Sequence, residues 1–300
     1  MHRIALSIDI EDWYHNPAVI GSEFSKYKTV DDFRKDHDFE IDKFTGPFNR
    51  VIGILKEFNV KATFFIVADM ARRFPWLVEK ITGGGHEIAC HGLYHYSKYD
   101  PHSGKMRFDA GRFEEMTAEA RNILETLSGC KVEGYRAPCA YICGEMLDSL
   151  EKLGFKYDSS VAVNSLYKKT GGPTEGVTTV PYFPVKGGLS AGGGKRNIIE
   201  FPWPYYQVMG IRMPSAGGPF LRFFGARYIS RGLKQSLSRG DTVLYFHAID
   251  ISDEKFPALG KNRPFYFAVK GKRVERRVRV LMEKFAERFC TCGSLLAKHM

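Results

Sequence analysis

Apolar runs alternate with helical stripes along the chain, and many of the apolar runs end at a polar residue. Uninterrupted or alternating apolar runs predict strands over 4–10, 62–67, 87–90, 132–135, about 157–160 and 242–246. Apolar residues at helical spacing predict helices over about 47–58, 76–83, 112–127, 144–153, 219–237 and 272–289. Strands that alternate with helices imply parallel strands joined by right-handed crossovers, so the expected fold class is α/β.

Polar residues stand where five of these strands end, namely Asp9, His91, Arg136, Asp158 and His247. Barrel enzymes carry their catalytic groups at the carboxyl ends of parallel strands. No glycine-rich dinucleotide fingerprint follows the first strand, which disfavours a dinucleotide-binding sheet. We therefore expect one barrel-like domain over 1–300, with an irregular, glycine-rich insertion over about 161–218.

The composition narrows the class of protein further. The chain has 300 residues, 44% of them hydrophobic and 26% charged, which excludes a disordered protein. It has no uncharged apolar run of about 18 residues, so we expect no transmembrane helix, and no signal peptide is recognisable. Six cysteines without a paired CxxC arrangement suit a reducing compartment, and the expected location is cytoplasmic.

The net charge of +10 is concentrated at one end of the chain. Residues 255–300 contain 12 lysines and arginines against three acids, and the predicted helix over 272–289 is basic. This charge suggests an anionic partner. We expect no nucleic-acid partner, because the basic residues fall on a helix whose other face is apolar and no recognition motif is present.

Two histidines four residues apart, His91 and His95, form the strongest local signal. They can converge on one metal ion if the segment turns helical after the strand, and zinc is a natural guest for imidazole ligands. The alternative is that both histidines satisfy hydrogen bonds in the core or in a loop.

The acidic cluster Asp9, Glu11 and Asp12 follows the first apolar run. Buried unpaired carboxylates are costly, so the cluster is either a solvated turn or the partner of a cation. Asp9 and Glu11 share a face of a regular strand, whereas Asp12 reaches that face only if the strand has ended.

Two further strand ends carry single polar residues. Arg136, followed by Ala137 and Pro138, is a plausible partner for one of the carboxylates, or else bridges a loop. His247 emerges from a buried strand and is suited to proton transfer, or else is a hydrogen-bonded structural histidine.

Taken in order, an acidic strand end, ATFF, HxxxH, RxP, a later Asp-Ser and a strand ending in His resemble the polysaccharide deacetylase family with the NodB-homology domain. The resemblance covers about 1–165 and 240–250. The runs GHEIACH, GYRAP and GGPFLR are similar to the branch associated with exopolysaccharide and lipopolysaccharide assembly.

This resemblance implies a distorted (β/α)7-type barrel and metal-dependent removal of an N-acyl group from an amino sugar of a glycan. It implies that Asp9 is the general base, that Arg136 orients Asp9, and that His247 is the general acid. It also implies one divalent ion, with zinc favoured, bound by His91, His95 and a third ligand.

The sequence departs from the family pattern in three places. Ile10 cannot bind a metal, so the third ligand is Glu11 or Asp12, and strand geometry favours Glu11. Gly92 stands where a hydroxyl residue is usual. The Asp-Ser segment lacks the usual tryptophan, so the candidates for the wall of the sugar pocket are Trp13, Tyr141 and Trp203.

Two other functions stay open. One is a metal-independent hydrolase of ureides or formamides with the same fold, and the other is a catalytically silent carbohydrate-binding relative.

The predicted helix over 219–237 sets basic residues beside aromatic ones. An anionic membrane surface or a lipid-linked diphosphate substrate would match this pattern, as would a solvated basic face on a helix that packs against the barrel.

Overall fold

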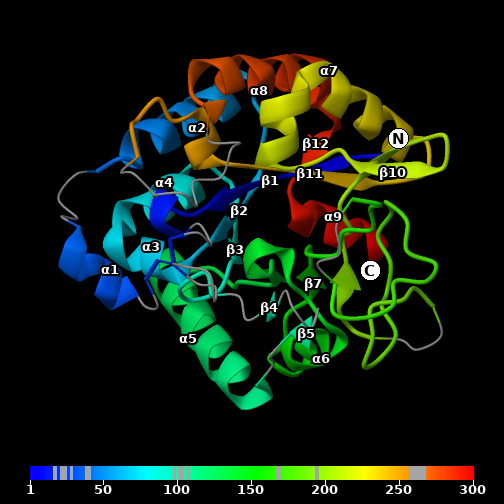
Figure 1. Ribbon diagram of the computed structural model, residues 1–300, viewed down its shortest axis with the longest axis horizontal. Coiled ribbons are helices and arrows are strands. Elements are labelled where there is room, and N and C mark those ends of the chain that lie inside the picture. The colour runs from blue at the N-terminus through cyan, green and yellow to red at the C-terminus, as the bar shows by residue number, and fades with distance from the viewer. Residues whose placement is uncertain are drawn as a thin grey trace.

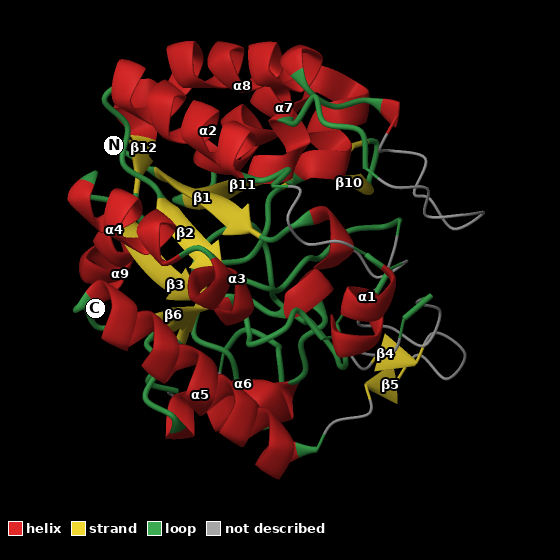
Figure 2. Cartoon of the chain, turned by 90° about the vertical axis from the view of Figure 1, so that its left-hand side faces the viewer, coloured by secondary structure: helices red, strands yellow, loops and turns green. Residues whose placement is uncertain are grey.

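Seven strands form one curved sheet in which every neighbouring pair is parallel (Figures 1 and 2). The computed structural model describes residues 1–15, 19–20, 26–27, 30–37, 42–96, 99–100, 105–106, 109–166, 170–192, 196–256 and 268–300. In spatial order the strands are β11 (Thr242–His247), β1 (Ile4–Ile10), β2 (Thr63–Ile66), β3 (Glu87–Cys90), β6 (Gly134–Tyr135), β7 (Tyr157–Asp158) and β8 (Ile199–Glu200). A short eighth strand, β12 (Phe289–Cys290), pairs with the start of β1.

The sheet curls but does not close, because no strand pairing joins β8 to β11 within the described ranges. The expected α/β class and the distorted barrel are thus confirmed. All seven residues of β1 are buried, as expected for a parallel strand that is covered on both faces.

The described helices cover the outside of the sheet, except for α1, which lies to one side of it (Figure 2). They are α1 (Val30–Asp36), α2 (Thr45–Glu57), α3 (Ala68–Arg73), α4 (Pro75–Gly83), α5 (Ala110–Ser128), α6 (Gly144–Lys152), α7 (Gly218–Leu237), α8 (Lys272–Phe285) and α9 (Cys292–His299). Helix α5 illustrates how local sequence sets the ends. The Asp109 side chain accepts the Arg112 N–H at its start, and Gly129 ends it in a left-handed conformation with φ of 66°.

Two small hairpins and four 3-10 segments complete the described structure. The hairpins are β4 (Tyr99–Asp100) with β5 (Lys105–Met106), and β9 (Tyr205–Val208) with β10 (Ile211–Pro214). The 3-10 segments are Trp13–His15, Pro138–Ala140, Ala248–Ile251 and Ala286–Arg288. The segment predicted as an irregular insertion therefore contributes β8 to the sheet and folds β9 and β10 into a hairpin.

The helix predicted over 272–289 is shorter than expected. Helix α8 ends at Phe285, and Phe289 instead begins strand β12, which is followed by the separate helix α9. Phe289 lies four residues after Phe285, so it continues the helical apolar spacing although its side chain is buried at the edge of the sheet. Within the described part of the chain, no helix is both long and apolar enough to cross a membrane.

Candidate active site

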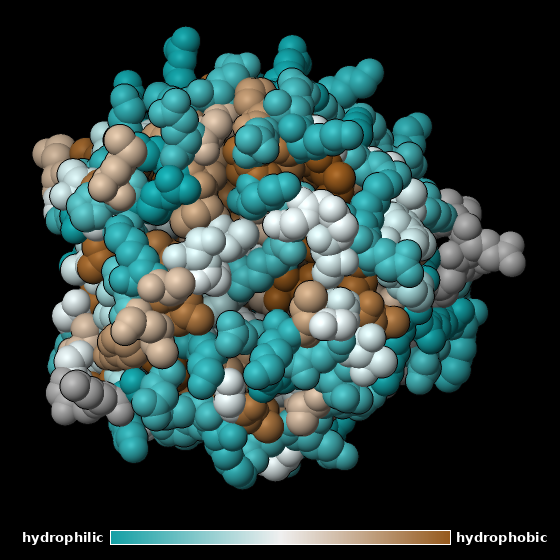
Figure 3. All heavy atoms as spheres, turned by 180° about the vertical axis from the view of Figure 1, so that it is seen from behind, coloured by the Kyte–Doolittle hydropathy of each residue, from teal (hydrophilic) through white to brown (hydrophobic). Residues whose placement is uncertain are grey.

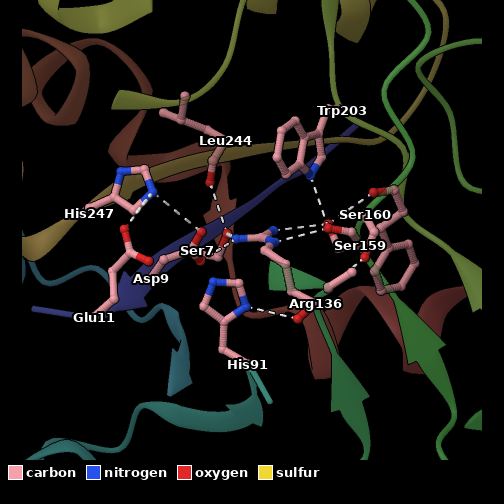
Figure 4. A network of polar contacts seen from close by, with 12 residues as sticks. Ser7, Asp9, Glu11, His91, Arg136, Ser159, Ser160, Trp203, Leu244 and His247 are labelled. Atoms are coloured by element: carbon pink, nitrogen blue, oxygen red, sulfur yellow. Dashed lines mark hydrogen bonds and ion pairs between the residues drawn. The ribbon is translucent and has the colours of Figure 1, made fainter. Parts of the chain in front are cut away.

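The polar residues that end the strands meet at one edge of the sheet (Figure 4). The register places Asp9 of β1 directly beside His247 of β11. His91 follows β3, and Arg136 follows β6. Asp9, His91 and Arg136 are each at most 2% exposed. The edge predicted from the sequence is therefore a buried polar cluster.

Glu11, His91 and His95 form the group within this cluster that can hold a metal ion. One potential ligand atom from each lies within 4.8 Å of the others. His91 Nδ1 lies 2.8 Å from the carbonyl oxygen of Arg136, and His95 Nδ1 lies 2.9 Å from that of His15. A carbonyl only accepts hydrogen bonds, so both Nδ1 atoms carry the proton in the neutral rings and both Nε2 atoms present lone pairs.

The contact between His95 and Glu11 fits a cation at this place. His95 Nε2 lies 2.7 Å from Glu11 Oε2, yet this buried oxygen accepts no hydrogen bond from the described residues. A neutral imidazole lone pair facing a carboxylate oxygen is repulsive unless a proton or a metal ion binds both. Burial also lowers the pKa of His91 to about 4, which keeps that ring neutral and able to bind a metal near pH 7. Two imidazoles and one carboxylate match the donor set of catalytic zinc sites with three protein ligands.

The segment from His91 to His95 is a loop, so the two histidines converge without the helical turn that their spacing was thought to require. Gly92 has φ of 78° and His95 has φ of 58°, both in the left-handed region. The loop nevertheless brings the two imidazole centroids to 4.9 Å. A β-carbon at Gly92 would also lie 3.3 Å from Pro138 Cγ, so the close approach of these two loops favours glycine at this position.

Asp12 lies outside the metal-binding group. Its Oδ2 lies 3.2 Å from Arg73 Nη1, and its Oδ1 accepts the Trp13 N–H at 2.7 Å. Burial raises the pKa of Asp12 to about 6. The structure thus brings Glu11, and not Asp12, to the two histidines.

Arg136 holds Asp9 through a fully buried ion pair, with 2.6 Å between Nη1 and Oδ1. Its other donors reach Ser7 Oγ, Ser159 Oγ and the carbonyl oxygen of Ser159, each at 2.9 Å. The guanidinium carbon also lies 4.0 Å from the centre of the Phe65 ring. Arg136 is therefore fixed on several sides, and it orients the carboxylate of Asp9.

His247 faces the same space from β11. Its Nε2 lies 3.9 Å from Asp9 Oδ2 and 3.6 Å from Glu11 Oε1. Its Nδ1 and its backbone N–H lie 3.2 Å and 2.8 Å from Asp250 Oδ2. Burial alone would lower the pKa of His247, but Asp250 together with Glu11 and Asp9 raises it to about 9.

Several residues of the site carried no recognised signal in the sequence. Asp250 is the partner of His247, and its Oδ1 accepts a hydrogen bond from Arg222 Nε at 2.7 Å. The spacing of three residues between His247 and Asp250 was an available clue, whereas Arg222 stood out only as the last residue of the run GGPFLR, with no indication that it would reach Asp250.

A second buried acid, Glu200, supports the region around Arg136. It stands beside Asp158 in the register of β7 and β8, and both residues are fully buried. Its Oε1 accepts the N–H groups of Ser160 and Val161 at 3.1 and 2.9 Å. Burial and the neighbouring Asp158 raise the pKa of Glu200 well above its ordinary value. This pair holds the turn whose Ser159 contacts Arg136.

Trp203 is the aromatic candidate for which the structure gives contacts beside Arg136. Its indole N–H donates to the carbonyl oxygen of Ser159 at 2.9 Å, and its ring centre lies 4.3 Å from that of Tyr245. Trp203 also lines a small hollow with Ala162, Val163, Asn164, Pro204, Tyr205, Pro214 and Ala216. Trp13 instead packs into a separate aromatic cluster with Tyr14 and Phe33.

A curled parallel sheet with a buried two-histidine, one-carboxylate group at its carboxyl edge defines the chain as an α/β protein of the barrel type with a candidate metal site. Residues 26–157 match the family described as polysaccharide deacetylase, and residues 172–297 match a domain of unknown function called DUF3473. The chain thus contains a segment that matches the polysaccharide deacetylase family, followed by a DUF3473 segment toward its C-terminal end. The second segment includes β11 and therefore shares the sheet with β1.

Individual relatives are similar to parts of the chain. A peptidoglycan-N-acetylglucosamine deacetylase of Bacillus cereus is 30% identical over 124 residues, which is 35% of this chain and 41% of that protein. The chain spans about a third to two fifths of the length of the curated relatives it matches.

Two solved structures share the fold over nearly the whole chain. A putative polysaccharide deacetylase from Mycobacterium smegmatis is 19% identical with a TM-score of 0.60, over 99% of this chain and 91% of that one. The Puue allantoinase is 16% identical with a TM-score of 0.55, over 99% of this chain and 90% of that one.

Proposed function

We propose that the chain is a metal-dependent hydrolase that removes an N-acetyl or other N-acyl group from an amino sugar of a polysaccharide or lipid-linked glycan. The observation that carries the proposal is the meeting of three units at one edge: the group Glu11, His91 and His95, the pair Asp9–Arg136, and His247. The family match and the relative that deacetylates peptidoglycan N-acetylglucosamine support this reaction class.

Glu11, His91 and His95 would hold one divalent ion, with zinc as our proposed metal. Such an ion lowers the pKa of a bound water and polarises an acyl carbonyl, which addresses the poor reactivity of an amide. The Nδ1–H groups of His91 and His95, fixed by the carbonyls of Arg136 and His15, keep the Nε2 atoms aimed at the site.

Asp9 is the proposed general base. Its Oδ1 is held by Arg136, and its Oδ2 lies toward His247, so one oxygen serves for orientation and the other for proton transfer. Asp9 would take a proton from water as the oxygen attacks the acyl carbon. A backbone N–H of the loop after Pro138, where Cys139 and Ala140 have φ of 58° and 60°, would stabilise the negative charge on the acyl oxygen.

His247 is the proposed general acid. An amine is a poor leaving group unless it is protonated, so Nε2 of His247 would donate a proton as the carbon–nitrogen bond breaks. Asp250 holds the opposite side of the ring, which keeps Nε2 directed toward Asp9 and Glu11. The products are a carboxylate and the free amino sugar.

The fold alone does not favour deacetylation over ureide hydrolysis, because the allantoinase structure shares it. The donor set favours the metal-dependent reaction, since both histidines and Glu11 are present and converge. A catalytically silent role is disfavoured by the geometry of Asp9, Arg136 and His247, whose reacting atoms lie within about one water molecule of each other.

The test combines metal analysis of the purified protein with release of acetate from N-acetylated oligosaccharides and peptidoglycan fragments. We expect about one equivalent of divalent metal and acetate release that a chelator abolishes. The His91→Ala variant is the matched control. Ring-opening hydrolysis of allantoin without acetate release would contradict the proposal, as would glycan binding without any hydrolysis by the metal-loaded protein.

A further inference from the structure

Four large apolar side chains lie exposed around the turn of the β9–β10 hairpin. Leu166, Val208, Met209 and Ile211 are 54%, 42%, 96% and 52% exposed. The backbone N–H of Ser165 donates to the carbonyl oxygen of Arg212, and that of Arg212 donates to Ser165 Oγ, which places Leu166 beside the hairpin. We call these four residues the apolar tip. The hairpin projects from the body in Figure 1, and apolar spheres occupy the corresponding edge in Figure 3.

The turn itself uses a residue that local structure does not favour. Met209 and Gly210 have φ of 49° and 82°, as in the two-residue turns that match the twist of a hairpin. Asn, Asp or Gly is favoured at the position of Met209, because a left-handed conformation strains other residues. The Met209 side chain is almost fully exposed, so no burial within the chain compensates for this backbone strain. This combination indicates contact with something outside the chain.

Cations accompany the apolar tip. Residues 201–240 include six lysines and arginines and no aspartate or glutamate. Reciprocal hydrogen bonds between Gln207 and Gln235 join the hairpin to α7 beside the exposed Arg231 and Lys234. Arg212 and Arg239 lie over the ring of Tyr205 at the base of the hairpin, at 5.0 and 4.8 Å from its centre. We call Arg212, Arg231, Lys234 and Arg239 the basic flank.

Two cations of α8 are engaged by contacts within the chain. Arg279 pairs with Glu57 and Glu275. Arg277 donates to the carbonyl oxygens of Leu221 and Arg222, next to the kink of α7 at Gly225. These two arginines thus serve contacts within the chain, whereas the exposed Arg231 and Lys234 lie beside the exposed apolar side chains of the hairpin.

We propose that the apolar tip and the basic flank dock on the surface of an anionic lipid bilayer. An apolar projection with cations beside it gains from contact with acyl chains and with phosphate groups at the same time, which is the chemistry of interfacial membrane binding. Strand β9 begins two residues after Trp203, which contacts Ser159 beside Arg136. Docking through this hairpin therefore connects the candidate active site to substrates anchored in the bilayer. Only this last step rests on the proposed function.

The direct test is flotation of the full chain with vesicles that contain phosphatidylglycerol and phosphatidylcholine, compared with vesicles of phosphatidylcholine alone. We expect binding to the anionic vesicles that weakens as salt is raised. The Met209→Asn variant should bind roughly tenfold more weakly, since it removes one inserted apolar side chain. It should melt no lower than the unchanged protein, because Asn tolerates the turn conformation better.

The basic flank is tested by Arg231→Glu combined with Lys234→Glu. At about fivefold per cation, the double variant should bind at least roughly 25-fold more weakly. Val280→Ser on α8, where the side chain is 44% exposed, and Lys56→Glu on α2 are the matched controls and should bind like the unchanged protein.

Three outcomes would overturn the docking proposal. These are no flotation of the unchanged protein, equal binding to neutral vesicles, and unchanged binding of the tip and flank variants. Acetate release from a soluble glycan, measured on the same preparations, separates this proposal from the proposed function. Vesicle binding without acetate release supports docking and contradicts the deacetylase, and soluble activity without flotation does the reverse.

Discussion

Asp250 Oδ2 lies 3.2 Å from His247 Nδ1 and also accepts the backbone N–H of His247. A carboxylate in this position favours the proton on Nδ1 and fixes the plane of the ring. The opposite nitrogen, Nε2, then lies toward Asp9 and Glu11. Arg222 holds the other oxygen of Asp250, so α7 takes part in the orientation of His247.

Replacing Asp250 with Asn should lower kcat by at least about tenfold with a smaller change in KM, because His247 loses the acceptor that sets its tautomer. Nitrogen NMR of labelled histidine should report a changed proton distribution between Nδ1 and Nε2 of His247. A merely structural role for Asp250 would lower stability and leave that distribution in the folded protein as it was.

The same carboxylate should contribute to stability against acid. Burial raises the pKa of Asp250, but Arg222 and His247 outweigh this and hold it at about 2, against an ordinary 3.8. A lowered pKa stabilises the folded state above about pH 4, and the contribution is lost as the pH falls toward 2. In Asp250→Asn the loss of unfolding free energy between about pH 5 and pH 2 should therefore be smaller by about 2 kcal/mol. Urea titrations measure this difference, with Glu79→Gln as the exposed control.

Metal content should separate Glu11 from Asp12. Glu11→Ala removes a ligand next to His95, so the purified variant should contain little divalent metal. Asp12→Ala should keep the metal and lose stability, because it leaves Arg73 without its carboxylate. Mass spectrometry of the metal in both variants decides the question, and loss of metal in Asp12→Ala alone would contradict the assignment.

Replacing Asp9 should mainly lower turnover, whereas replacing Arg136 should mainly lower the free energy of unfolding. Asp9→Asn keeps an acceptor for Arg136 but cannot take a proton, so turnover should fall by at least about 100-fold with metal content and melting temperature nearly unchanged. Arg136→Ala leaves a buried carboxylate unpaired and should lower the unfolding free energy by about 3–5 kcal/mol. Acetate release and thermal melting on both variants test the contrast.

Gly218 should resist substitution for a steric reason. A β-carbon at this position would lie 2.2 Å from Asp250 Oδ2, so Gly218→Ala should displace Asp250 and destabilise the fold by about 1–3 kcal/mol. Gly46 near the start of α2 is the matched control, because a β-carbon there would have nothing within 4 Å. Equal melting temperatures for the two alanine variants would show that the α7 start has room to move.

The sequence predicted the strand ends and the face of β1 more reliably than the loops. Side chains alternate between the two faces of a strand, so Glu11, two residues after Asp9, was expected on the face of Asp9. This expectation depends only on strand geometry. The loop from His91 to His95 escaped prediction, because the positive φ of His95 is uncommon for a residue other than glycine and no local pattern indicates it.

Long-range partners were equally hidden from the sequence. Arg222 reaches Asp250 from another element, and Glu200 reaches Asp158 only because the insertion contributes a strand. In the same way, Phe289 continues the apolar spacing of α8, but it lies in strand β12 and pairs with the start of β1. Each of these contacts is decided by tertiary packing.

The place of β1 inside the sheet has a consequence for how the chain is made. β1 pairs with β2 on one side, but its partner on the other side, β11, comes more than two hundred residues later. A ribosome that adds about 5–20 residues per second leaves that edge of β1 open for many seconds. An open apolar edge pairs readily with other chains, so the yield of soluble protein should depend on holdase chaperones and on slow growth at low temperature.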